Sequence, residues 1–235
     1  YYFLIKTVIN GVVMRNELVA VIPVRVGSTR IKRKNFQPFG EYKTLIHQKI
    51  DHLKRSGRIN KIYLSSNNDE VRSIADECNV EYLEREDYYC SSEARWDEVV
   101  THIVESIPGS PHILWAMVTS PLFIRYHDAI NEYFLGLEEG YDSLIGVKKI
   151  NEYLIDESGR PLFFAFGPWH PYTTEFKPMY AINDVVFIAS KDLNIKFRYW
   201  FGRNPKLLEC DAIESIDVNY PDDLKLAIAA NRIEE

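Results

Sequence analysis

The stretch at residues 18–35, LVAVIPVRVGSTRIKRKN, constrains the fold most, because a run of apolar and β-branched residues gives way abruptly to small and cationic ones. Continuous apolar runs of this kind are typical of strands buried on both faces of a parallel sheet. In open α/β sheets, ligands bind beyond the carboxyl ends of the strands. The sequence therefore predicts a ligand site formed by the residues that follow Val24.

The residue types after this strand favour an anionic ligand. Gly27 permits close approach of the backbone, and Ser28 and Thr29 supply hydrogen-bond donors. Positive side chains that would balance phosphate charge are Arg25, Arg30, Lys32, Arg33 and Lys34. The alternative interpretation is a basic surface loop that joins a strand to a helix. The motifs G-x-x-x-x-G-K-[ST] and G-x-G-x-x-G are absent, so we do not expect the nucleotide sites built on them.

The composition limits the classes of protein that fit. A chain of 235 residues with 46% hydrophobic content can bury a full core, and a net charge of -6 argues against general nucleic-acid or membrane binding. The cationic cluster is therefore a local feature, which favours a small anion. Cys78, Cys90 and Cys210 are widely spaced, which is typical of a reduced, cytoplasmic protein without disulfides or zinc.

Residues 1–17 read as an N-terminal extension. Their apolar residues are interrupted by Lys6, Asn10 and Arg15, so the segment makes a poor signal peptide or membrane span. Met14 is a candidate natural start. We expect the main domain to cover residues 18–235.

Strand and helix patterns alternate through the first half of the domain. Thr44 is placed to cap a helix that Gly57 ends, a strand follows at 61–65, the segment NNDEVRSIADEC reads as a helix, and residues 80–83 as a strand. Further helices are predicted at 97–107, at 128–137 and from Pro221, with strands at 112–118, 143–147, 184–189 and 206–210. This order predicts an α/β three-layer sandwich with a mostly parallel sheet. Aromatic, proline and glycine residues at about 150–182 indicate an inserted arm.

The segment VRVGSTRIKRKN resembles the N-terminal signature of the acylneuraminate cytidylyltransferase (CMP-sialic acid synthetase) family, A-R-x-G-S-[KT]-[GR]-[IL]-P-x-K-N. Arg25, Ser28, Lys34 and Asn35 fall on matching positions, and Lys32 replaces the usual proline. Thr29 and Arg30 are similar to the related ketodeoxyoctonate cytidylyltransferases, which carry S-T-R-L-P-x-K.

Three later segments resemble the same family, in order and at suitable spacing. Residues 116–123, AMVTSPLF, are similar to L-Q-P-T-S-P-L-R, and residues 180–189, YAINDVVFIA, to Y-x-P-N-G-A-I-Y-I. Residues 214–224, ESIDVNYPDDL, are similar to D-I-D-T-P-E-D-L. The resemblance implies a nucleotide-diphospho-sugar transferase-like fold over most of the chain, with the arm forming a homodimer.

The resemblance also implies a reaction, in which CMP passes from CTP to a nonulosonic or related 2-keto sugar acid and pyrophosphate leaves. By that resemblance the catalytic residues are Arg25, Lys34 and Asp217, and Mg²⁺ is held at Asp217 and Ser215. The implied nucleotide-binding residues are Arg25, Gly27, Ser28, Thr29, Arg30, Lys34, Asn35, Ser66 and Asn67. The implied substrate-binding residues are Met117, Thr119, Ser120 and Asn183.

Several positions depart from the family pattern. Ser215 stands where the first aspartate of the metal motif D-x-D is expected, and Met117 replaces a glutamine that in the family contacts the sugar. Asn67 replaces an aspartate, and Tyr172 or Thr173 stands where the arm carries an arginine. These departures leave two alternatives: a nucleotidyltransferase with another acceptor, and a catalytically silent nucleotide-binding relative. The partners expected are CTP and a sugar acid, without nucleic acid or membrane.

Overall fold

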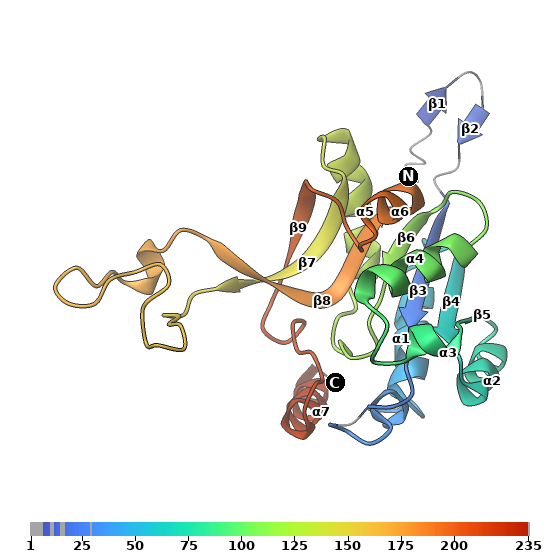
Figure 1. The fold of residues 1–235 in the computed structure, drawn as a ribbon, viewed down its shortest axis with the longest axis horizontal. Helices are drawn as coiled ribbons and strands as arrows, with labels where there is room; N and C mark the ends of the chain where they lie inside the picture. The colour runs from blue at the N-terminus through green and yellow to red at the C-terminus, as the bar shows by residue number, and fades with distance from the viewer. Residues whose placement is uncertain (1–6, 10–11, 15–16, 29, 235) are drawn as a thin grey trace.

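A computed structural model describes residues 7–9, 12–14, 17–28 and 30–234 of the chain, and its centre is a seven-stranded sheet in the order β5-β4-β3-β6-β8-β7-β9 (Figure 1). The strands of the sheet are β3 (Leu18–Pro23), β4 (Lys61–Ser66), β5 (Glu81–Glu84), β6 (His112–Trp115), β7 (Ser143–Ile150), β8 (Met179–Ser190) and β9 (Pro205–Cys210). Strands β3, β4, β5 and β6 pair in parallel, as do β7 and β9, whereas β8 runs antiparallel to both of its neighbours. The predicted mostly parallel sheet is confirmed.

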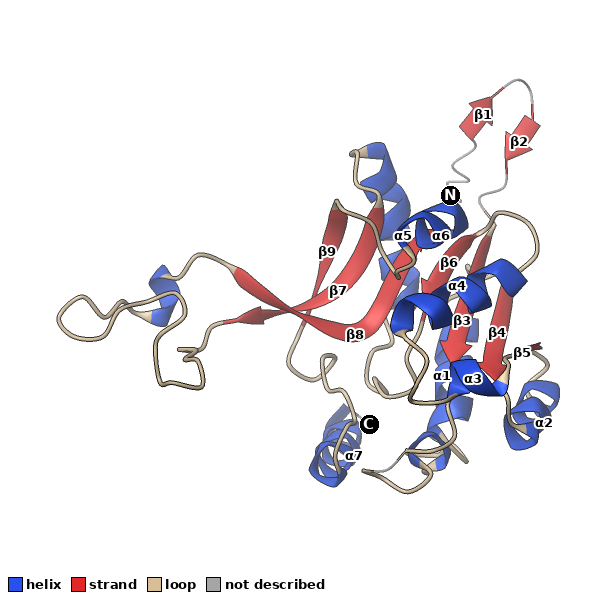
Figure 2. Cartoon of the chain, in the orientation of Figure 1, coloured by secondary structure: helices blue, strands red, loops and turns tan. Residues whose placement is uncertain are grey.

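Helices cover both faces of the sheet, which gives the predicted three layers (Figure 2). Leu18, Ala20 and Ile22 of β3 belong to a core shared with helices on one face, and Val19 and Val21 to a core shared with α4 on the other. The helices of the first face are α1 (Leu45–Arg55), α2 (Asp69–Glu77), α5 (Tyr126–Glu138) and α7 (Pro221–Glu234). The opposite face carries α4 (Trp96–Ser106) and α6 (Lys191–Phe197).

The residues predicted to begin and end helices and strands lie close to the observed boundaries of these elements. The Thr44 hydroxyl accepts a hydrogen bond from the backbone N–H of His47 at the start of α1, and Gly57 follows the helix with a φ of 65°. Strand β6 ends at Trp115 rather than at residue 118, so the following residues are free to form a loop at the edge of the sheet. Helix α6 and the short α3 (Asp87–Cys90) were not predicted.

The region at about 150–182 projects from the body of the molecule (Figure 1). Strands β7 and β8 pair antiparallel from Val147↔Ile182 to Ile150↔Met179, and they carry a long loop with the 3-10 turn η2 (Thr173–Glu175). The last residues of the predicted arm are therefore part of β8. They form a two-stranded ribbon with β7.

The N-terminal segment forms a separate hairpin of β1 (Thr7–Ile9) and β2 (Val12–Met14). Lys6, Asn10, Arg15 and Thr29 lie outside the described residues. In the described part of the chain, no helix combines the length and the apolar character needed to cross a membrane.

Lys49 of α1 is fully buried and supports the loop after β6. Its Nζ lies 2.7 Å from the carbonyl oxygen of Ser120 and 2.7 Å from the hydroxyl of Tyr126. Burial lowers the pKa of Lys49 to about 7, because the charged amine loses its hydration. Its Nζ donates a hydrogen bond to each of these oxygens, which compensates part of the lost hydration.

This burial predicts a pH dependence of stability. Between pH 7 and 9 the unfolded chain holds a proton on Lys49 that the folded chain releases, so the free energy of unfolding rises with pH. The slope from this residue is up to about 1.4 kcal/mol per pH unit. Urea unfolding at several pH values should show this slope in the wild type and lose it in Lys49→Met. Equal slopes in both proteins would contradict the prediction.

Candidate active site

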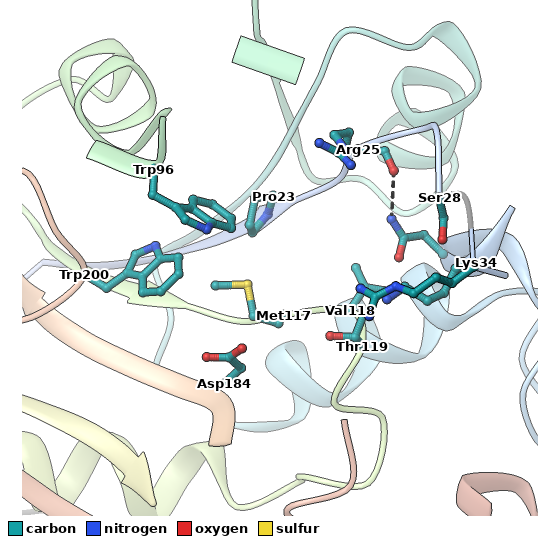
Figure 3. A pocket seen from close by; sticks show the side chains of 12 residues that line it. Pro23, Arg25, Ser28, Lys34, Trp96, Met117, Val118, Thr119, Asp184 and Trp200 are labelled. Carbon is teal, nitrogen blue, oxygen red and sulfur yellow. Dashed lines mark hydrogen bonds between the residues drawn. The ribbon is translucent and has the colours of Figure 1, made fainter. Parts of the chain in front are cut away.

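A pocket of about 270 Å³ opens at the carboxyl edge of β3 and β6 (Figure 3). Its lining comes from the end of β3, the loop after it, the start of α4, the loop after β6, strand β8 and the segment after α6. These residues are Pro23, Arg25, Ser28, Arg30, Lys34, Asn35, Trp96, Met117, Val118, Thr119, Asp184 and Trp200. The pocket thus lies where the sequence predicts a ligand site.

One side of the pocket is cationic and comes from the loop after β3. Arg25, Arg30 and Lys34 line it, and Lys34 begins the 3-10 turn η1 (Lys34–Phe36). The side-chain amide of Asn35 donates to the carbonyl oxygen of Arg25 at 3.1 Å, which closes the loop on itself. Gly27 has a φ of 134°, a conformation that favours glycine. The loop is therefore shaped by its own contacts into a curved, positively charged wall.

A smaller cavity of about 220 Å³ lies inside this loop, next to the main pocket. Gly27, Ser28, Lys32 and Arg33 contribute to its lining. Thr29, which was predicted to bind nucleotide, falls outside the described residues. The two cavities share Arg25, Ser28, Lys34 and Asn35, so the cationic side chains of the loop line both of them.

The segment before α7 is held against this cationic loop. Lys34 Nζ donates to the carbonyl oxygen of Val218 at 2.7 Å, and Arg30 donates to the side-chain oxygen of Asn219 at 3.1 Å. The backbone N–H of Val218 donates to the carbonyl oxygen of Thr119 at 2.7 Å. Three parts of the chain that are distant in sequence therefore meet at one edge of the sheet.

Asp217 lies within this junction, beside Lys34. Burial lowers the pKa of Lys34, and the opposite charge of Asp217 raises it, so the two side chains interact electrostatically. Asp217 Oδ2 accepts a hydrogen bond from Asn219, whereas Oδ1 is buried without a hydrogen-bond partner. The structure brings the predicted residues Lys34 and Asp217 together, and of the two Lys34 lines the pocket.

The hydroxyl of Ser215 is hydrogen-bonded to another side chain of the protein. Its hydroxyl accepts a hydrogen bond from the side-chain amide of Asn183 at 2.9 Å. The adjacent Glu214 forms an ion pair with Arg125 at 2.5 Å, so it is directed elsewhere. Asn183 is buried and lies behind the pocket wall.

The remaining predicted residues fall into two groups. Met117 and Thr119 line the pocket. Ser120 is buried beneath it, with its hydroxyl 3.3 Å from the carbonyl oxygen of Asp184. Ser66, the last residue of β4, and Asn67, which follows it, are outside the pocket lining; Ser66 is buried and Asn67 donates to Asp87 at 2.9 Å.

Five residues that line the pocket were not among the predicted site residues: Pro23, Trp96, Val118, Asp184 and Trp200. Trp96 and Trp200 stand beside Met117, opposite Lys34 and Ser28, and the two indole rings lie 4.8 Å apart in an edge-to-face arrangement (Figure 3). Asp184 lies below Met117 on the same side. The sequence contained a hint that Asp184 has an unusual backbone conformation. The similar family motif has glycine at this position, and aspartate is among the residues that tolerate a left-handed backbone.

A further cavity of about 370 Å³ adjoins the main pocket, with which it shares Pro23, Arg25, Trp96 and Met117. Its floor includes Arg85, whose buried guanidinium donates to the carbonyl oxygen of Val24 at 2.8 Å. The combined space runs from the cationic loop to the aromatic wall. It suits a ligand with an anionic part and a flat or apolar part.

The residues at the site fit a magnesium ion that is completed by a ligand's own oxygens. The buried, unpartnered Oδ1 of Asp217 is an oxygen for which a cation would compensate. No group of three or more His, Cys, Asp or Glu residues in the described part of the chain could hold a metal ion. Mg²⁺ commonly binds one or two carboxylates and takes its other oxygens from water and substrate phosphates.

The fold and the pocket define an α/β protein of the nucleotide-diphospho-sugar transferase-like class, with a cationic loop after the first strand of the sheet. A family model described as cytidylyltransferase matches residues 19–115 of the chain.

Curated proteins match the chain at low identity. The chain is 23% identical over 222 residues to N-acylneuraminate cytidylyltransferase from Escherichia coli O18:K1:H7 (strain RS218 / NMEC), covering 92% of this chain and 52% of that protein. It is 22% identical over 218 residues to the N-acylneuraminate cytidylyltransferase of Streptococcus agalactiae serotype V, covering 87% and 51%. The chain therefore spans about half the length of the curated relatives it matches.

Solved structures share the fold. A CMP:2-keto-3-deoxy-manno-octonic acid synthetase complexed with CTP aligns with a TM-score of 0.67 at 12% identity, covering 93% of this chain and all of that one. The 4-diphosphocytidyl-2C-methyl-D-erythritol synthase from Anaerococcus prevotii aligns with a TM-score of 0.65 at 14% identity, covering 92% and 98%.

Proposed function

We propose that this chain is a magnesium-dependent cytidylyltransferase that transfers CMP from CTP to a nonulosonic or related 2-keto sugar acid and releases pyrophosphate. The single observation that carries the proposal is the junction of Arg30 and Lys34 with the segment that bears Asp217, in the same pocket wall as Arg25. The relatives named N-acylneuraminate cytidylyltransferase support the choice of CTP and of a sugar acid. Since CTP is a cytoplasmic nucleotide, the proposal places the reaction in the cytoplasm.

The proposed reaction is mainly a problem of positioning and charge. The hydroxyl of the sugar acid attacks the α-phosphorus of CTP, a P–O bond to the pyrophosphate breaks, and the hydroxyl proton is lost. Arg25 and Lys34 would neutralise the negative charge that builds up on the phosphate oxygens. A bound Mg²⁺ would add positive charge at the same oxygens. Its candidate ligand in the motif is Asp217, since Ser215 contributes at most a neutral oxygen.

A different acceptor is the second candidate, and specific residues favour it. Met117, Trp96 and Trp200 give the pocket an apolar wall where the similar family has glutamine at position 117. The arm has Tyr172 and Thr173 where that family carries an arginine, so a bidentate partner for a carboxylate is missing there. Ser215 favours the alternative of a catalytically silent nucleotide-binding relative, because the metal motif has one negative charge fewer with serine at this position.

We predict that Lys34→Met lowers kcat/KM for CTP by about 100-fold, because a preorganised positive charge on the phosphates is removed. Release of pyrophosphate from CTP is measured with a panel of 2-keto sugar acids, and the products are identified by mass spectrometry. Lys61→Met is the matched control, since Lys61 is an exposed lysine at the amino end of β4, across the sheet.

The outcomes separate the candidates. Release of pyrophosphate with another alcohol or sugar phosphate, and with none of the keto acids, would support the second candidate. Binding of CTP without turnover, and without tighter binding when Mg²⁺ is added, would support the silent alternative. Equal activity of Lys34→Met and Lys61→Met would contradict the role of Lys34.

We also propose that the arm pairs two copies of the chain. Trp169 is 80% exposed, Tyr172 77% and Phe166 60%, and all three belong to the long loop between β7 and β8, which projects from the body (Figure 1). Tyr153, Phe164 and His170 pack together at the base of this surface, which gives the aromatic patch a defined shape. A patch of exposed aromatic residues on one segment is typical of a protein interface.

If the arm pairs two copies of the chain, substitutions of its exposed aromatic residues should lower the molecular mass of the particle in solution. The wild type should behave as a dimer in size-exclusion chromatography with light scattering, and Phe166→Ser with Trp169→Ser should give a monomer with an unchanged circular dichroism spectrum. Leu226→Ser removes an exposed apolar residue of α7 and should stay dimeric. A monomeric wild type would contradict this proposal, as would a dimeric double variant.

A further inference from the structure

The pocket has a carboxylate that the family motifs do not account for. Of the described residues that line it, Asp184 is the acidic one. In the similar family motif Y-x-P-N-G-A-I-Y-I, the corresponding position is glycine. The chain has therefore gained a carboxylate at Asp184 and lost one at Ser215, and both changes fall at the same edge of the sheet.

A β-bulge directs Asp184 out of the strand. The pairing of β7 with β8 jumps from Ile145↔Phe187 to Val147↔Ile182, so residues 183–186 stand opposite Gly146 alone. Asp184 has a φ of 48°, in the left-handed region. A bulge breaks the alternation of side chains along a strand and re-aims them, often beside active sites.

Gly146 makes this bulge possible. A Cβ atom at position 146 would lie 2.4 Å from Cγ2 of Val185 and 2.7 Å from Oδ1 of Asn183. These distances are far below ordinary van der Waals contact, and Val185 and Asn183 are both buried. The bulge is thus packed into place by the neighbouring strand, and the position of Asp184 is fixed by the core.

The bulge is also tied to the segment that carries Asp217. Asn183 donates to the hydroxyl of Ser215 at 2.9 Å, and the hydroxyl of Ser120 donates to the carbonyl oxygen of Asp184 at 3.3 Å. The neighbouring Thr119 accepts a hydrogen bond from the N–H of Val218. These contacts hold Asp184 and Asp217 near enough for their negative charges to repel, which adds to the effect of burial in raising the pKa of Asp184.

We propose that Asp184 supplies the second carboxylate for the divalent cation, in place of the aspartate that Ser215 has replaced, and that it works with Asp217. The inference rests on the proposed binding of CTP. Two neighbouring carboxylates are stabilised by a shared cation. The unpartnered Oδ1 of Asp217 supplies one oxygen, Asp184 faces the pocket, and the triphosphate and water complete the shell.

The test measures how much Mg²⁺ tightens the binding of CTP. Isothermal titration gives Kd for CTP with EDTA and with saturating Mg²⁺ in the wild type, Asp184→Asn and Asp184→Gly. Asparagine and glycine both accept a left-handed backbone, so both variants should fold, which circular dichroism checks. The control is Asp222→Asn, which removes an exposed carboxylate in the first turn of α7.

We expect Mg²⁺ to lower Kd for CTP at least tenfold in the wild type and in Asp222→Asn. Both Asp184 variants should lose most of this gain, about 10- to 100-fold. With EDTA they should bind CTP as well as the wild type or better, because a negative charge that faces the triphosphate is gone. An equal gain from Mg²⁺ in the wild type and both Asp184 variants would overturn the role of Asp184 and leave the proposed function standing. No binding of CTP to the wild type would overturn both.

Discussion

The hydrogen bond from Lys34 to the carbonyl oxygen of Val218 joins two segments 184 residues apart, and the site depends on it. On one side of this bond lies the loop after β3, and on the other lies the segment that leads into α7. Arg30 reinforces it by donating to Asn219 and by lying over the ring of Tyr220 at 4.8 Å. Without this junction the cations would form a basic surface loop, and Asp217 would be an ordinary carboxylate before a helix.

The reversed direction of β8 gives the sheet its asymmetry. Parallel strands bring their carboxyl ends to one edge, but a strand that runs the other way crosses that edge with its early residues. Asn183 and Asp184 are such residues, so an antiparallel strand carries side chains into a site otherwise built from strand ends. The same strand continues outward as the ribbon of the arm, and the core therefore connects the pocket to the projecting surface (Figure 2).

Local sequence predicted the first half of the fold well. The unbroken apolar run at 18–24 identified a strand buried on both faces, and the small and cationic residues after it located the ligand edge. The cap Thr44 acts within its own helix, so its effect is visible in sequence. Each of these signals depends on residues a few positions apart, which is why it could be read without the structure.

The rest of the site depends on contacts between distant residues. The sequence predicts a strand at 184–189, and only Gly146 on the neighbouring strand shows why the chain bulges at its start. Trp200 reaches the pocket through α6, a seven-residue helix too short to show periodicity. Ser215 reads in sequence as a lost metal ligand. In the structure it is the anchor of Asn183, next to the carboxylate that faces the pocket.

Charge balance explains why these features belong together. Arg30 and Lys34 repel each other, and so do Asp184 and Asp217, while the attraction between Lys34 and Asp217 offsets part of both repulsions. A ligand that presents both a polyphosphate and a divalent cation compensates both sets at once. The buried Lys49 beneath Ser120 holds the loop between the two sets without adding a further full charge, because burial lowers its pKa to about 7. The proposed metal–nucleotide complex would therefore bring opposite charges to both sets of side chains.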